Sequence, residues 1–142
     1  MPNREDDELG SDIRGPEDVV AFLRACDVPT TDRSQIVLGL ACCEAEPDKH
    51  GLCGAAVRSG EDAERVIDCD QLVALAEELV ACSLVVATIE PGAPTVPARS
   101  DVEHFVALRR ACADEGVVLL DWIVVTGHHW CSLRGQVIRE AA

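Results

Sequence analysis

Basic side chains are scarce in this sequence. Lys and Arg together number 12, against 26 Asp and Glu, and the formal net charge at pH 7 is −14. A protein that binds nucleic acid unaided needs clustered Lys and Arg to neutralise the phosphates. The composition therefore excludes unaided nucleic-acid binding, and the excess of acids is typical of a solvated protein surface.

Long apolar runs are also missing. No stretch approaches the roughly 18–20 consecutive apolar residues of a membrane-spanning helix. The N-terminus has no basic region followed by an apolar one, which is the pattern of a secretory signal. We therefore expect no membrane association and a cytoplasmic location. At 142 residues, with 48% hydrophobic and 27% charged residues, the composition is that of one soluble globular domain.

Apolar patterns predict the order of helices and strands between two short tails. Residues 1–14 are rich in acids and predict a disordered acidic tail, residues 15–138 a single domain, and residues 139–142 a second tail. Amphipathic periods indicate helices, and unbroken apolar runs indicate buried strands. The expected elements are a helix after Gly15-Pro16, a hairpin of strands 34–43 and 52–57, a helix at 69–81 capped by Asp68, a strand at 84–87, a helix at 102–113, and strands at 117–125 and 130–133. This order predicts an α/β sandwich with a mixed sheet.

The stretch Leu84–Asp101 combines a buried strand with a stiff loop. Prolines and a glycine crowd residues 91–97, and each proline fixes φ and removes a donor. Ser100 or Asp101 is expected to cap the helix that follows. A loop at the carboxyl end of a strand is the usual place for a site in an α/β domain, so we expect the functional site here.

This stretch, with DWIVVTGHHWCSLRG from Asp121 to Gly135, resembles the RadC-like branch of the JAB/MPN (JAMM) metallopeptidase domains. Members of that family carry a His-x-His-Pro-Ser-Gly loop, a Pro-rich run ending in Ser-x-x-Asp, and a later strand reading Asp-His-hydrophobic-Ile-Val. The resemblance extends back to Asp32. It implies the JAB/MPN (cytidine-deaminase-like) fold, a three-layer arrangement of a mixed β-sheet flanked by helices, and zinc-dependent hydrolysis of peptide or isopeptide bonds.

Most of the family's motif positions are changed in this sequence. The resemblance places the first metal histidine at Thr88, the second at Glu90, the motif serine at Ala98 and the catalytic glutamate near Ala55, while the metal aspartate is retained as Asp101. A hydrolytic zinc site needs about three protein ligands and a base beside the metal-bound water. We therefore expect a degenerate site with no catalytic residue and no cofactor.

Two functions of different classes remain. The preferred one is a non-catalytic binding or scaffold domain, a pseudoenzyme whose groove takes a protein or peptide partner above Thr88, Glu90 and Asp101. The alternative is a zinc peptidase or isopeptidase that holds its metal through Glu90, Asp101 and a third group. This alternative lacks an evident base near Ala55, and Glu61 and Glu64 are acids that follow that position in the sequence. Members of this fold often pair, so a homodimer is a further expectation.

The eight cysteines do not form a recognised metal or redox motif. No Cys-x-x-Cys is present, and most cysteines lie in apolar runs, where they are expected to be buried small hydrophobes. One cluster consists of residue types that bind zinc: Cys42, Cys43, His50 and Cys53. Its spacing matches no familiar zinc finger, and adjacent residues on a strand point to opposite faces. We therefore interpret these residues as ordinary core cysteines near a hairpin. The cysteines that lie in apolar runs, and are therefore expected to be buried, are Cys26, Cys82, Cys112 and Cys131.

Three histidines and a tryptophan lie near the resembling segments. His128 and His129 are expected in a solvent-exposed turn, and His104 on the solvated side of a helix. Trp122 takes the place of the family's histidine after Asp121. Its large apolar ring is expected to pack against the helix.

Overall fold

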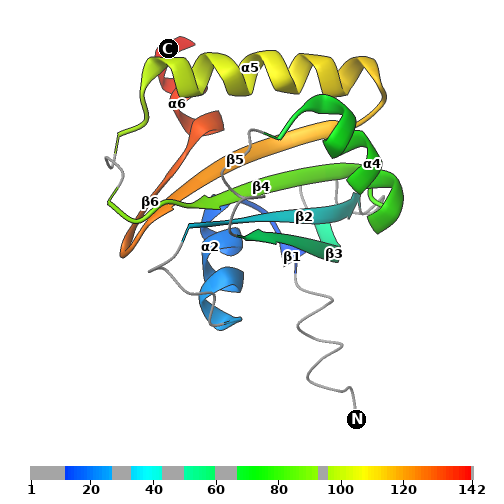
Figure 1. Ribbon diagram of the computed structural model, residues 1–142, viewed down its shortest axis with the longest axis horizontal. Helices are drawn as coiled ribbons and strands as arrows, with labels where there is room; N and C mark the ends of the chain where they lie inside the picture. Colours follow the sequence, from blue (N-terminus) through cyan, green and yellow to red (C-terminus); the bar gives the residue numbers. More distant parts are fainter. Residues whose placement is uncertain (1–11, 27–32, 43–49, 60–66, 93–95, 142) are drawn as a thin grey trace.

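The computed structural model describes residues 12–26, 33–42, 50–59, 67–92 and 96–141. Six strands form one mixed sheet in the order β1-β3-β2-β4-β5-β6, with helices on both faces (Figure 1). In chain order the elements are β1 (Asp12–Ile13), α2 (Pro16–Ala25), β2 (Ser34–Cys42), β3 (His50–Ser59), α4 (Cys69–Leu79), β4 (Ser83–Ile89), α5 (Arg99–Asp114), β5 (Val118–Thr126), β6 (His129–Ser132) and α6 (Leu133–Ala141).

The central strand is β4, whose sequence is apolar almost throughout. All seven of its residues are buried. It pairs antiparallel with β2 and parallel with β5, and α5 makes the crossover that two parallel strands require. Strands buried on both faces have continuous apolar sequences. The buried strand expected at 84–87 and the β2–β3 hairpin are therefore confirmed.

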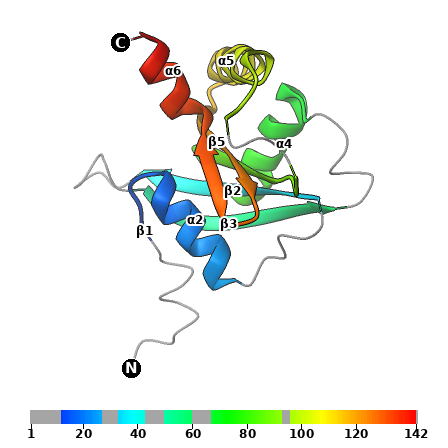
Figure 2. The same cartoon turned by 90° about the vertical axis from the view of Figure 1, so that its left-hand side faces the viewer.

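Helices cover both faces of the sheet. Figure 2 shows α2 on one face and α4, α5 and α6 on the other. Successive strand residues point to opposite faces, so the sheet separates two cores. The α2-side core includes Val19, Leu38, Val85 and Ile123, and the α5-side core includes Phe105, Leu72, Val37 and Val86. The predicted three-layer α/β arrangement is confirmed.

The domain begins earlier and ends later than the sequence indicated. Asp12 and Ile13, which were assigned to the tail, pair with β3, and Ile13 is buried because it joins the α2-side core. Residues 1–11 lie outside the described part. At the other end, α6 includes residues 139–141, which were also assigned to a tail. Both differences arise from pairing and capping between distant segments, which local sequence patterns do not show.

Burial of the cysteines follows their position relative to the cores. Cys112 is buried among the α5-side residues, as expected, and Cys131 is half-buried. Cys26 and Cys82 are exposed, so the expectation of buried thiols is wrong for them. Cys26 follows the last turn of α2, and Cys82 precedes the first residue of β4, so neither lies on the apolar face of its element.

Val80 ends α4 in a strained conformation, with φ 53° and ψ 47°. It is β-branched and 85% exposed, so its side chain gains little packing in return for the left-handed backbone. Replacing Val80 with glycine should raise the free energy of unfolding by about 1 kcal/mol, because glycine has no Cβ to strain. Urea denaturation checks this. The Val80→Ala control keeps the Cβ and should gain much less; equal gains would contradict the strain argument.

Candidate functional site

The loop after β4 leads into α5, as the sequence indicated, although residues 93–95 lie outside the described part. The helix begins at Arg99, three residues before its expected start, and its N-cap is Ala98. Asp101 acts from the first turn: its Oδ2 accepts a hydrogen bond from the Ala98 N–H at 3.1 Å. A helix start leaves several N–H groups unsatisfied, and a first-turn carboxylate also suits the helix dipole. Asp101 is thus part of the helix start, and not its N-cap.

Thr88, on β4, is held by a side chain from the neighbouring strand. Thr88 is only 5% exposed, and its Oγ1 accepts a hydrogen bond from Trp122 Nε1 at 2.8 Å. The indole also meets His104 of α5 edge to face, with ring centroids 6.2 Å apart and an interplanar angle of 68°. The prediction that Trp122 packs against the helix is confirmed. Its polar edge satisfies the buried hydroxyl of Thr88.

A polar row crosses the sheet at the level of Thr88. Gln35 of β2 lies opposite both Thr88 and Arg58 of β3. It is 3% exposed, and its Oε1 accepts a hydrogen bond from an Nη of Arg58 at 2.7 Å. Directly opposed residues share a face of the sheet, so these three side chains lie on the α5 face. Sequence reasoning missed Gln35 and Arg58; the available signal was a glutamine beginning an otherwise apolar run.

Ala55 is not brought together with the other motif positions. It lies opposite Leu38, which belongs to the α2-side core, whereas the adjacent Val37 belongs to the α5-side core. Ala55 therefore faces away from Thr88. The residue of β3 that shares the level and face of Thr88 is Arg58. Glu61 and Glu64, the alternative acids, lie outside the described residues.

Asp121 organises a second polar centre at the start of α6. It is 6% exposed; Oδ1 accepts from the N–H groups of Trp122 at 2.7 Å and Arg134 at 3.1 Å, and Oδ2 accepts from the Ser132 hydroxyl at 2.6 Å. Ser132 Oγ accepts in turn from the Gly135 N–H at 3.0 Å. Burial raises the pKa of Asp121, and these hydrogen bonds partly offset the rise. The network satisfies two N–H groups that α6 leaves unpaired at its start.

An irregularity in β5 decides which side of the sheet Asp121 faces and which side Trp122 faces. Leu84 pairs with Leu119 and Val85 pairs with Asp121, so Leu120 is an extra residue between two paired positions. Asp121 therefore shares the face of Val85, on the α2 side. Trp122 points the other way and joins the α5-side core.

A comparison with known protein families agrees with the fold described above. The sequence profile of the RadC-like JAB domain matches residues 13–138. This chain belongs to the RadC-like JAB domain family. The matched range begins in β1 and ends in α6, so both terminal elements belong to the RadC-like JAB domain. A search of curated proteins found no match.

The zinc site implied by the RadC-like JAB resemblance does not fit the residues present. Of the three metal positions, Thr88 is a buried hydroxyl bound to Trp122. Glu90, which follows β4 and donates its N–H to the Val125 carbonyl at 2.9 Å, and the exposed Asp101 supply carboxylates. Within the described ranges, no group of three or more His, Cys, Asp or Glu is arranged to hold a metal ion. Zinc in proteins takes about three to four such ligands, and this donor set is short of them.

The thiol cluster of the RadC-like JAB domain lies mostly outside the described residues. Cys43 and the side chains of Cys42 and His50 belong to that undescribed part, so the cluster stays a prediction. The backbone pairs Cys42 with His50. Cys53 is exposed at a register shift of the hairpin, and its Sγ lies 3.8 Å from the Val80 carbonyl oxygen, to which it donates.

Among the residues that the structure describes, the remaining histidines belong to no group of three or more metal-ligating side chains. His128 is exposed in the turn between β5 and β6, as predicted, and His129 is exposed as the first residue of β6. The His128 carbonyl accepts a hydrogen bond from an Nη of Arg24 at 3.2 Å. His104 is exposed on α5, as predicted, although one face of its ring contacts Trp122.

Proposed function

We propose that this RadC-like JAB domain is a non-catalytic binding or scaffold domain whose partner is a protein or peptide. The observation that carries the proposal is the 2.8 Å hydrogen bond from Trp122 Nε1 to Thr88 Oγ1. The resemblance puts the first metal histidine at Thr88, and a buried hydroxyl already bound by an indole is a poor replacement for an imidazole ligand. The Trp122 ring packs against the α5-side core and contacts His104 of α5.

The charges around Thr88 support the same proposal. Asp101 uses one carboxylate oxygen to hold the Ala98 N–H, so metal binding would compete with the helix start. Arg58 brings a positive charge to the level and face of Thr88, and a guanidinium disfavours a nearby divalent cation. Ala55, the position proposed for the catalytic acid, faces the other side and has no proton acceptor.

The same groups suit recognition. The Arg58 guanidinium carries five N–H donors in a planar fork, and Gln35 accepts from one of them. Glu90 is half-buried at the end of β4 and Asp101 is exposed at the start of α5. Donors and carboxylates at the end of β4 and the start of α5 can bind the backbone and charged groups of a peptide without cleaving it.

Metal content of the purified full chain tests this proposal. The protein is incubated with zinc, dialysed and measured by elemental mass spectrometry, beside Asp101→Ala and the control Asp114→Ala at the other end of α5. We expect zinc well below one equivalent in all three proteins and no peptidase or isopeptidase activity, because the ligand set is incomplete. Circular dichroism verifies that each variant is folded.

Two other outcomes have defined meanings. Zinc near one equivalent in the wild type and Asp114→Ala, but lost from Asp101→Ala, would overturn the proposal in favour of a metal-dependent hydrolase using Glu90 and Asp101. Zinc that survives Asp101→Ala lies elsewhere, and the cluster of Cys42, His50 and Cys53 becomes its expected site. That outcome leaves the proposal in place, since the JAB positions would still hold no metal.

A further inference from the structure

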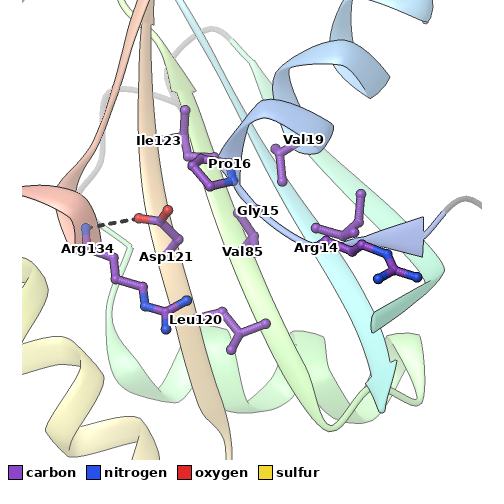
Figure 3. Close-up of a pocket in the computed structure, with 10 residues that line it drawn as sticks. Arg14, Gly15, Pro16, Val19, Val85, Leu120, Asp121, Ile123 and Arg134 are labelled. Carbon is purple, nitrogen blue, oxygen red and sulfur yellow. Dashed lines mark hydrogen bonds between the residues drawn. The ribbon is translucent and has the colours of Figure 1, made fainter. Parts of the chain in front are cut away.

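A cavity of about 370 Å³ lies on the α2 face of the sheet. Figure 3 shows it between the first turn of α2 and strand β5, with the start of α6 at one side. Its apolar wall comes from Val85 and Ile123 of the sheet, Leu120 of the β5 irregularity, and Pro16 and Val19 of α2. Small-molecule sites in proteins have volumes of roughly 300–1,000 Å³ and mainly apolar walls, so the cavity has the size of a small-ligand site.

Asp121 lines this cavity, and most of its acceptor capacity is already used. Its two carboxylate oxygens already accept three hydrogen bonds, from Trp122, Ser132 and Arg134. Asp121 is buried, and burial raises its pKa while the charge of Arg134 partly lowers it. A ligand with several negative charges is therefore disfavoured beside this buried carboxyl group, whereas a single charge can be held away from it.

Arg134 supplies the positive group. Its backbone N–H binds Asp121, while its side chain runs toward Leu120 at the edge of the cavity (Figure 3). Arg14 also lines the cavity, but its guanidinium is turned away from Asp121 and toward β1. The acids of the first turn of α2 are Glu17 and Asp18, and Asp18 Oδ2 accepts the backbone N–H of Arg14 at 2.8 Å. The group best placed to meet a ligand is therefore the Arg134 guanidinium.

We propose that this cavity binds a small monocarboxylate with an apolar body. The apolar part lies against Val85, Leu120 and Ile123, and the carboxylate pairs with Arg134. A planar guanidinium matches a carboxylate with two parallel hydrogen bonds, and such charge-assisted bonds are stronger than neutral ones. The site is independent of the proposed binding function, because it lies on the opposite face of the sheet from Thr88.

Titration of the full chain with octanoate tests the site. Methyl NMR shifts report location, and isothermal calorimetry reports affinity. We expect saturable binding with shifts at Val19, Val85 and Ile123, and binding of 1-octanol that is about tenfold weaker, because the alcohol lacks the charge that Arg134 pairs with. Arg134→Gln should weaken octanoate binding about tenfold and leave 1-octanol unchanged. Arg134→Lys should retain part of the affinity.

A matched control variant separates the effect of Arg134 from the general effect of losing an arginine. Arg110→Gln, on the exposed side of α5, should leave octanoate binding as in the wild type. Equal affinity for octanoate and 1-octanol, or equal effects of Arg134→Gln and Arg110→Gln, would overturn the role of Arg134. Shifts confined to the α5 side, or no saturable binding of either compound, would overturn the site. Arg134 is exposed, so its replacement should not prevent folding, and the wild-type comparison of the two ligands does not depend on any variant.

Discussion

Replacing Asp121 with alanine should lower the free energy of unfolding by about 3 kcal/mol. The change removes the acceptor of the Ser132 hydroxyl and of the N–H groups of Trp122 and Arg134. A buried donor without a partner costs about 1–3 kcal/mol, and Asp121 is only 6% exposed, so water replaces the carboxylate poorly. Urea denaturation at neutral pH measures the loss.

The controls separate this network from the general effect of losing an acid. Asp114→Ala removes an exposed carboxylate from α5 and should change stability by less than about 0.5 kcal/mol. Equal losses for the two variants would contradict the role given to Asp121. The pKa of Asp121 is raised in the folded state from the ordinary value of 3.8, chiefly by burial. The added stability that comes from protonating this buried carboxyl group is therefore fully present below pH 3.8 and is lost as pH rises through the folded pKa, while the hydrogen bonds to the carboxylate remain at neutral pH. Asp121→Asn should lack this decline.

Replacing Phe105 with alanine should cost about 4 kcal/mol. Phe105 is fully buried and is among the largest side chains of the α5-side core, where it lies with Leu72, Val86 and Leu119. Truncation loses the transfer free energy of the ring and leaves a cavity that the rigid sheet below cannot close. Thermal or urea unfolding, followed by circular dichroism, gives the measurement.

A conservative replacement checks the cause of that loss. Phe105→Leu keeps most of the apolar volume and should cost clearly less, about 1–1.5 kcal/mol. A loss for Phe105→Ala as small as that expected for Phe105→Leu would mean that the helix shifts to fill the space. It would also mean that α5 is less firmly packed on β4 and β5 than its buried side chains indicate.

The central elements could be predicted because their signals are local. The apolar run of β4 and the Asp68 cap are visible in the sequence, and the structure confirms the cap: Asp68 Oδ1 accepts from the Gln71 N–H, and Gln71 Oε1 accepts from the Asp68 N–H. In contrast, α6 starts where Asp121, 13 residues before Arg134, accepts the Arg134 N–H. No periodicity in a short segment reports a cap supplied from another strand.

In the candidate site, too, positions along the chain could be predicted and contacts between distant segments could not. The resemblance located Thr88, Glu90 and Asp101 at the end of β4 and the start of α5, and the structure places them there. It could not show that Trp122, 34 residues later, would bind the Thr88 hydroxyl. Nor could it show that Arg58 faces Thr88 while Ala55 does not, because the facing of a strand residue depends on register.

The extra residue in β5 sets the side of the sheet that each later residue of the strand faces. By taking Leu120 out of the pairing, the strand shifts its alternation by one residue, so that Asp121 faces the α2 side and Trp122 faces the α5 side. The sheet then works as a partition between two surfaces that share no side chain. A substitution on one surface can change what that surface contacts and leave the packing of the other surface intact.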